Sequence, residues 1–172
     1  MVVWLVGLSG AGKTTIARHL TQFISQSKPN TVLVDGDDIR EVFKFNQTLD
    51  AYSVEGRRLN AERIVEICKW LDRQNINVIC SILCIFHDIL RSNRNQFSQY
   101  YEVSVQVPLE ELFKRDIKDL YKAAMAGDRQ NVVGVDIPWV SPPNPDLLID
   151  NTGALVDCKE LALSIARKVE FL

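Results

Sequence analysis

A glycine-rich segment follows directly on a short apolar run at the start of the sequence. Residues 2–6 are continuously apolar and rich in valine, and residues 7–14 read GLSGAGKT. This spacing fits the pattern G-x-x-x-x-G-K-[ST], in which backbone N–H groups surround phosphate oxygens. A buried parallel strand, a tight glycine loop and a helix then follow one another, so the segment predicts an α/β fold that binds a nucleotide.

The residues on either side of the glycine-rich segment strengthen the motif assignment, which would otherwise rest on four fixed positions alone. Residues 14–27 place Ile16, Leu20, Phe23 and Ile24 on one face of a helix. An ordinary glycine-rich turn is the alternative interpretation, and the strand before it and the helix after it argue against that alternative.

The pattern assigns a role to each of its polar residues. We expect Lys13 to supply positive charge at the transferred phosphate of ATP and the Thr14 hydroxyl to bind Mg²⁺. The predicted ATP-binding residues of this segment are Gly7, Ser9, Gly10, Ala11, Gly12, Lys13, Thr14 and Thr15.

Length and composition limit the possible classes of protein. The chain has 172 residues, which predicts a single domain over residues 1–172. Its formal charge of −2 provides no general attraction to nucleic acid or anionic membranes, so we predict neither as a partner. No stretch approaches the ~20 apolar residues of a membrane span, and the opening run lacks the basic flank of a signal peptide. The predicted location is the cytoplasm.

Apolar runs alternate with helical patterns along the rest of the chain. Four further runs predict strands at 31–34, 78–82, 103–107 and 147–149, and helices are expected at 54–73, 109–126 and 157–171. This alternation predicts a three-layer α/β domain with a central parallel five-stranded sheet. Residues 127–145 are rich in Gly, Pro and Asn without periodicity, which predicts a mobile lid over about 115–145.

Four cysteines at positions 68, 80, 84 and 158 show neither zinc-site spacing nor the density of a disulfide scaffold. Cys80 and Cys84 stand near a predicted strand end, where redox activity is one interpretation. Small buried thiols in a reducing compartment are the favoured interpretation.

Carboxylates follow the second predicted strand. Parallel sheets bind ligands beyond the carboxyl ends of their strands, so Asp35 and Asp37 are candidate catalytic residues that orient the acceptor hydroxyl or accept its proton. Asp38 is interpreted instead as the cap of a helix that begins near Ile39. Together with Lys13 and Mg²⁺, these groups meet the main requirements of phosphoryl transfer.

Basic residues form two groups. One or two arginines of the first group are expected to bind an anionic acceptor, and this group comprises Arg40, Arg57, Arg58 and Arg63. The second group stands at the entrance to the predicted lid and comprises Lys114, Arg115, Lys118 and Lys122. Arg115 and Lys118 are the members that we expect to bind ATP on closure.

Several motifs in order along the chain resemble those of the adenylylsulfate kinases. They are GLSGAGKTT at 7–15, VDGDDIR at 34–40, R-x-x-N at 57–60, VICS at 78–81, RDIKDLYKAAMAG at 115–127 and PPNPDLLID at 142–150. The resemblance covers almost the whole chain. It implies a homodimeric, Mg-ATP-dependent kinase that phosphorylates the ribose 3′-hydroxyl of adenylyl sulfate, a small nucleotide substrate. The implied substrate-binding residues are Asp37, Arg40, Tyr52, Arg57, Asn60 and Ser81.

The departures from the family pattern concern the acceptor. Residues 81–87 read SILCIFH where the family has S-[FL]-I-S-P-[YF]-R, so Cys84, Ile85 and His87 replace serine, proline and arginine. The family's G-F-[ST]-G becomes NVVG at 131–134, and Val132 cannot stack on adenine as an aromatic ring does. Losing one aromatic face removes about 1 kcal/mol of base recognition. Trp139 either compensates for this loss or covers the core.

Three functions therefore remain open from the sequence. The first is an adenylylsulfate kinase with an altered acceptor pocket, and the second is a kinase of another nucleotide-linked acceptor, such as a cytidine diphosphate derivative. The third is a noncatalytic nucleotide-binding module. The presence of Lys13, Thr14, Asp35 and Asp37 argues against the third.

Overall fold

A central parallel sheet with helices on both faces organises the chain. The computed structural model describes residues 1–48, 50–116, 119–153 and 157–169. The strand order is β2-β3-β1-β4-β5, with β1 in the middle, and every described pair of neighbouring strands is parallel. The strands are β1 Val2–Val6, β2 Thr31–Asp35, β3 Asn77–Ile82, β4 Tyr100–Gln106 and β5 Leu147–Asp150. The five-stranded α/β fold predicted from the alternating pattern is confirmed.

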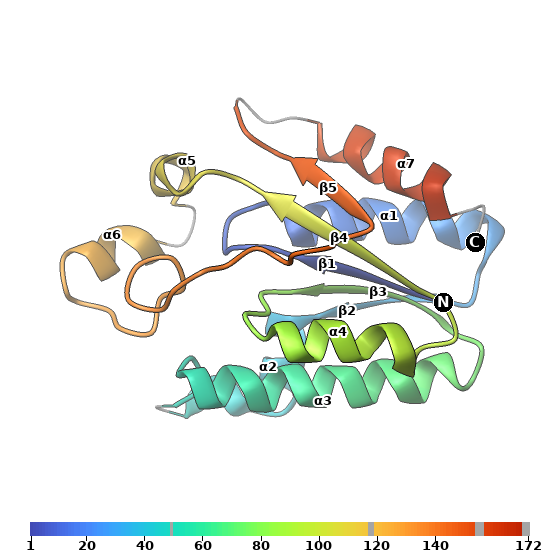
Figure 1. Cartoon of the computed structure of the whole chain (residues 1–172), viewed down its shortest axis with the longest axis horizontal. Helices are drawn as coiled ribbons and strands as arrows, with labels where there is room; N and C mark the ends of the chain where they lie inside the picture. Colours follow the sequence, from blue (N-terminus) through green and yellow to red (C-terminus); the bar gives the residue numbers. More distant parts are fainter. Residues whose placement is uncertain (49, 117–118, 154–156, 170–172) are drawn as a thin grey trace.

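The helices form the two outer layers. Figure 1 shows α1 (Lys13–Ser27) and α7 (Cys158–Val169) on one face of the sheet, and α3 (Val54–Asp72) and α4 (His87–Gln96) on the other. The short helix α2 (Gly36–Val42) and the 3₁₀ turn η1 (Phe45–Gln47) connect β2 to α3.

The central strand explains why its sequence is continuously apolar. Alternate side chains of a strand point to opposite faces, so Val3 and Leu5 join the core under α1 and α7, whereas Val2, Trp4 and Val6 join the core under α3 and α4. All five residues of β1 are buried. A strand covered on both faces has no polar side, which is why it forms an uninterrupted apolar run.

The helix predicted over 109–126 is instead two short helices, α5 (Leu109–Arg115) and α6 (Leu120–Met125). The Asp116 carboxylate accepts hydrogen bonds from the backbone N–H groups of Tyr121 at 2.9 Å and Lys122 at 3.0 Å. An aspartate that binds backbone N–H groups in this way starts a helix rather than continuing one. Lys118, a predicted ATP ligand, lies outside the described residues.

Two further differences from the sequence-based expectation concern helix starts. Asp35, not Asp38, caps α2, because its Oδ1 accepts the Asp37 N–H at 2.9 Å. Helix α4 was not predicted at all. Its buried face consists of Ile89, Leu90 and Asn93 within an otherwise polar segment, which is too little periodic apolar content to identify it.

The cysteines behave as buried thiols. Cys68, Cys80 and Cys84 are free and buried, and Cys158 is half-buried. Burial raises the pKa of Cys80 well above its usual value and raises that of Cys84 to about 12. Neither thiol ionises near neutral pH, so the structure gives no support to a redox role.

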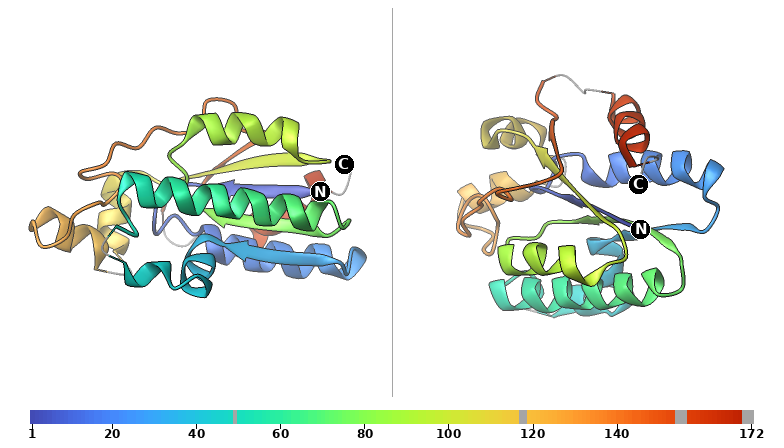
Figure 2. Two further views of the ribbon diagram at one scale, coloured as in Figure 1. Left: turned by 90° about the horizontal axis from the view of Figure 1, so that it is seen from below. Right: turned by 45° about the vertical axis from the view of Figure 1, so that its right-hand side comes forward.

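The segment predicted as a lid lies at the functional end of the sheet. Figure 2 shows α5, α6 and the loop that follows α6 beyond the carboxyl ends of the strands, from where the chain runs back alongside the sheet to β5. The Asp136 carboxylate accepts the N–H groups of Asn131 at 2.6 Å and Val132 at 2.5 Å, so this part of the segment has defined internal contacts. Its movement stays a prediction, as does the single-domain boundary. Among the described helices, none has the length and apolar character that crossing a membrane requires.

Candidate active site

The loop between β1 and α1 requires glycine at three of its positions. Gly10 and Gly12 have φ angles of 77° and 90°, a conformation that other residues rarely adopt. A Cβ atom on Gly12 would lie 2.6 Å from Asn151 Nδ2, and one on Gly7 would lie 2.3 Å from the Val105 carbonyl oxygen. The glycines predicted from the motif are therefore fixed both by backbone conformation and by close neighbours.

Two residues from distant parts of the chain hold this loop. Asn151, directly after β5, donates from Nδ2 to the Ala11 carbonyl at 2.9 Å, and the Tyr121 hydroxyl donates to the Ser9 carbonyl at 2.8 Å. Sequence reasoning missed both residues. Asn151 has the property that identified Asp35, because it is a polar residue at the carboxyl end of a parallel strand.

Replacing Asn151 with alanine is expected to loosen the phosphate-binding loop. Asn151 is buried, so the change leaves the Ala11 carbonyl without this donor and costs about 1–3 kcal/mol of stability. We expect a lower melting temperature and a several-fold higher KM for ATP. Asn95→Ala, an exposed position in α4, is the matched control. An ATP KM equal to that of the control would show that Asn151 does not shape the loop.

Thr14 and Asp35 form the oxygen-rich part of the site. The Thr14 hydroxyl donates to Asp35 Oδ2 at 2.8 Å, and the Ser81 hydroxyl oxygen lies 3.5 Å from that of Thr14. No cluster of three or more His, Cys, Asp or Glu side chains suitable for a metal occurs within the described ranges. Mg²⁺ commonly uses one or two protein oxygens together with substrate phosphates, so Thr14 and Asp35 fit a magnesium ion that ATP helps to hold.

Lys13 is the first residue of α1 and is buried in the loop. Its Nζ donates to the Leu8 carbonyl at 2.7 Å, so the ammonium group curls back over the glycine loop. Lys13 thus lines the cavity, and its contact with the phosphates of ATP stays a prediction.

Asp37, Arg40 and Tyr52 form a second group across the cavity. Arg40 is buried and donates from Nη1 to Asp37 Oδ1 at 3.0 Å. The guanidinium carbon of Arg40 lies 4.8 Å from the centre of the Tyr52 ring, which is cation–π distance. The ion pair and the ring together orient a carboxylate whose side chain is 60% exposed.

Arg57 connects α3 to the predicted lid. It donates from Nε to the Tyr52 carbonyl at 2.8 Å and from Nη2 to the Asn131 carbonyl at 2.8 Å. Burial, and then the neighbouring charge of Arg40, lower the pKa of Arg57 to about 10, so it stays protonated at neutral pH. Sequence reasoning expected this arginine to bind the acceptor, and the structure shows two of its donors bound to backbone carbonyls.

Other predicted residues support the site from outside the cavity. Asn60 is buried and donates from Nδ2 to the Gly36 carbonyl at 3.2 Å, which positions the start of α2. Arg115 donates from Nη2 to the Asn151 carbonyl at 2.7 Å and so holds the segment after β5. Arg58 pairs with Asp88, and Arg63 lies over aromatic rings near η1, so neither faces the cavity.

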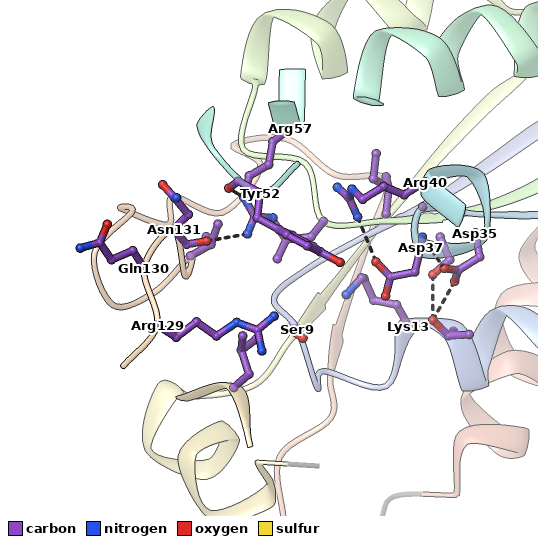
Figure 3. Close-up of a pocket in the computed structure, with 17 residues that line it drawn as sticks. Ser9, Lys13, Asp35, Asp37, Arg40, Tyr52, Arg57, Arg129, Gln130 and Asn131 are labelled. Carbon is purple, nitrogen blue, oxygen red and sulfur yellow. Dashed lines mark hydrogen bonds and ion pairs between the residues drawn. The ribbon is translucent and has the colours of Figure 1, made fainter. Parts of the chain in front are cut away.

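A single cavity at the carboxyl ends of β1, β2 and β3 brings most of the predicted residues together (Figure 3). The predicted residues that line it are Ser9, Lys13, Thr14, Asp35, Asp37, Arg40, Tyr52, Arg57 and Ser81. Residues to which sequence reasoning gave no role also line it, and these include Leu120, Arg129, Gln130, Asn131 and Val133.

Four residues that depart from the family pattern, Cys84, Ile85, His87 and Val132, do not line this cavity, whereas Asn131 and Val133 of the NVVG segment do. His87 instead contacts the Val140 carbonyl through Nε2 at 3.1 Å. Val132 and Cys84 are buried in the core, and Trp139 lines a separate groove beside β4 and β5. The expectation that Cys84, Ile85, His87 and Val132 alter the acceptor pocket therefore stays a prediction, and in this structure these four residues lie outside the cavity lining.

Comparison with known proteins agrees with this arrangement. The model of a family described as adenylylsulphate kinase matches residues 1–150. The chain is 36% identical over 173 residues to the adenylyl-sulfate kinase of Pseudomonas aeruginosa, covering 99% of this chain and 84% of the relative. It is also 36% identical over 151 residues to the cytidine diphosphoramidate kinase of Campylobacter jejuni, covering 88% and 86%.

A solved structure has the same fold. The Mycobacterium tuberculosis APS kinase CysC, in complex with AMPPNP and APS, superimposes with a TM-score of 0.83. The two sequences are 25% identical, and the match covers 98% of this chain and 96% of that one. The relatives are therefore kinases with different named acceptors.

Proposed function

Because this chain belongs to the adenylylsulphate kinase family, we propose that it transfers the γ-phosphoryl group of ATP to the ribose 3′-hydroxyl of adenylyl sulfate. One observation carries the proposal: a single cavity joins the phosphate-binding loop to a carboxylate pair, three arginines and an aromatic ring. Phosphoryl transfer needs this combination of positive charge, an oriented acceptor and a proton acceptor.

In this proposal Lys13 and the N–H groups of the glycine loop bind the phosphates of ATP, and Thr14 with Asp35 holds Mg²⁺. When bound, that ion neutralises charge on the transferred phosphate. Asp37, oriented by Arg40, accepts the proton of the acceptor hydroxyl. Tyr52 contributes an aromatic face for the acceptor's base.

A second candidate function is phosphorylation of a cytidine diphosphate derivative. The similarity to the Campylobacter jejuni enzyme favours it. The cavity lining points the same way, because Tyr52 is the one aromatic residue among the described residues that line it. A single ring encloses a base less completely than two rings do, which favours a smaller pyrimidine base.

A coupled assay of ADP release distinguishes the two candidates. The panel comprises adenylyl sulfate, cytidine diphosphoramidate, nucleoside monophosphates and small hydroxylated metabolites. We expect adenylyl sulfate to give the highest kcat/KM, and a higher value for cytidine diphosphoramidate would replace the first candidate by the second. Activity confined to small sugars or acids would overturn both.

The assembly and location of the protein belong to the same proposal. A homodimer in the cytoplasm is what the resemblance to the family implies. Light scattering on the purified protein measures the assembly directly, and a monomeric mass at assay concentration would contradict the dimer.

A further inference from the structure

Arg129 lines the cavity from the segment that follows α6, and no family motif in the sequence assigned it a role. Figure 3 shows its side chain on the wall opposite Tyr52, extending toward Ser9 of the glycine loop. The residue is exposed. Within the described part of the chain, Arg129 has no hydrogen bond or ion pair to another residue.

The backbone next to Arg129 is held in place. The Asn131 carbonyl accepts the Arg57 Nη2 donor at 2.8 Å, and the Asn131 N–H donates to Asp136 at 2.6 Å. Val133, two residues further on, is buried in the core. On the other side of Arg129, the Asp128 N–H donates to the Ala123 carbonyl at 2.9 Å. Arg129 therefore extends from a segment that is fastened on both sides, and its side chain lines the cavity.

The cavity carries an excess of positive charge although the whole chain has a formal charge of −2. Its charged lining residues are Lys13, Asp35, Asp37, Arg40, Arg57 and Arg129. Arg40 is paired with Asp37, and Arg57 donates to two backbone carbonyls. Arg129 adds a planar guanidinium group, which is suited to bidentate contacts with phosphate or sulfate oxygens.

We propose that Arg129 determines acceptor specificity by binding the outer anionic group on the 5′ side of the acceptor nucleotide. This inference rests on the proposed function. Both candidate acceptors carry two linked acidic groups there, so the ligand chemistry is the same for adenylyl sulfate and for a cytidine diphosphate derivative.

The position of Arg129 favours the acceptor over ATP. Asn131, two residues after Arg129, accepts a hydrogen bond from Arg57 of α3 through its carbonyl. Arg57 also donates to the carbonyl of Tyr52, the residue proposed to contact the acceptor's base. The contacts that secure the glycine loop from the β5 side come instead from Asn151 and from Arg115 behind it. Arg129 therefore belongs to the wall that faces Tyr52 and Arg40.

Binding measurements test the proposal without relying on turnover. The probes are adenylyl sulfate against AMP, and CDP against CMP, measured by titration calorimetry with the full chain. Each pair differs in the outer anionic group. For the pair that the wild type binds, we expect Arg129→Gln to weaken binding of the ligand that carries the outer anionic group by at least about 10-fold. This is the effect of losing a charge-assisted contact. The affinity for the ligand without the outer group, AMP or CMP, should change less than about 3-fold.

Two variants complete the design. Arg129→Lys keeps the charge but loses the bidentate geometry, so an intermediate affinity is expected. Arg91→Gln, an exposed arginine in α4, is the matched control and should equal the wild type. Circular dichroism checks that each variant is folded.

The outcomes separate this inference from the proposed function. An Arg129→Gln variant that keeps the wild-type preference for the outer group overturns the role of Arg129, and so does a variant in which only the KM for ATP rises. If the wild-type protein turns over no acceptor of the assay panel, the proposed function fails. The paired binding measurements still report on Arg129 in that case.

Discussion

Replacing Lys13 with alanine is expected to abolish phosphoryl transfer to every acceptor while the protein stays folded. The ammonium group is buried within the glycine loop, where water screens its charge poorly. Its loss removes positive charge at the site where negative charge accumulates during transfer. We expect kcat/KM to fall by roughly 10³-fold or more, as for other charge-stabilising groups in dry active sites.

We expect the variant to stay folded because Lys13 is the first residue of α1, and alanine has a high helix propensity. ADP release by Lys13→Ala, measured across the acceptor panel, checks the prediction. Lys159→Ala removes an exposed lysine from α7 and should retain wild-type activity. A kcat/KM of the Lys13 variant within about tenfold of the wild-type value, with any acceptor, would refute the assigned ATP site.

The second large effect is expected for Asp35→Ala. This carboxylate accepts the Thr14 hydroxyl with one oxygen and caps α2 through the Asp37 N–H with the other. Its removal therefore disturbs the proposed magnesium ligand and also the backbone that carries Asp37. We expect kcat to fall by about 10²–10⁴-fold, within the usual range for a lost catalytic carboxylate.

Two further variants separate these effects of Asp35. Asp35→Asn keeps an oxygen acceptor for the cap but loses the charge, so an inactive variant with wild-type thermal stability assigns the effect to charge. Loss of the cap alone costs about 1 kcal/mol and appears as a lower melting temperature in Asp35→Ala. Asp38→Ala, at an exposed position in α2, should stay within a few fold of the wild type. Asp35→Ala activity within tenfold of wild type would exclude a central role.

The features that could be predicted from sequence are those fixed by local chemistry. The glycine loop was recognisable because positive φ angles and close backbone neighbours exclude other residues there. The strands were recognisable because burial on both faces leaves no polar positions. Asp35 and Asp37 followed from the rule that parallel sheets bind ligands at the carboxyl ends of their strands.

The features that could not be predicted depend on contacts between residues distant in the sequence or on the direction in which a side chain points. Asn151 and Ala11 are 140 residues apart. Arg57 and Arg58 are adjacent on α3, but successive helical residues point about 100° apart, so one reaches the cavity and the other reaches Asp88. A count of basic residues cannot make that distinction.

The core is divided between the two faces of β1, and this division affects how acceptor specificity can change in the evolution of such a kinase. The glycine loop and α1 pack on one buried cluster, whereas α3, which carries Arg57, packs on the other, and no fully buried side chain is shared between them. The partly buried side chains of Ile85 and Trp139 pack against both clusters. Away from these two residues, substitutions in one cluster have no shared partner in the other and act nearly independently on stability. Drift beneath α3 can thus reshape acceptor recognition while the ATP-binding loop stays unaltered, so the two halves of the site can evolve at different rates.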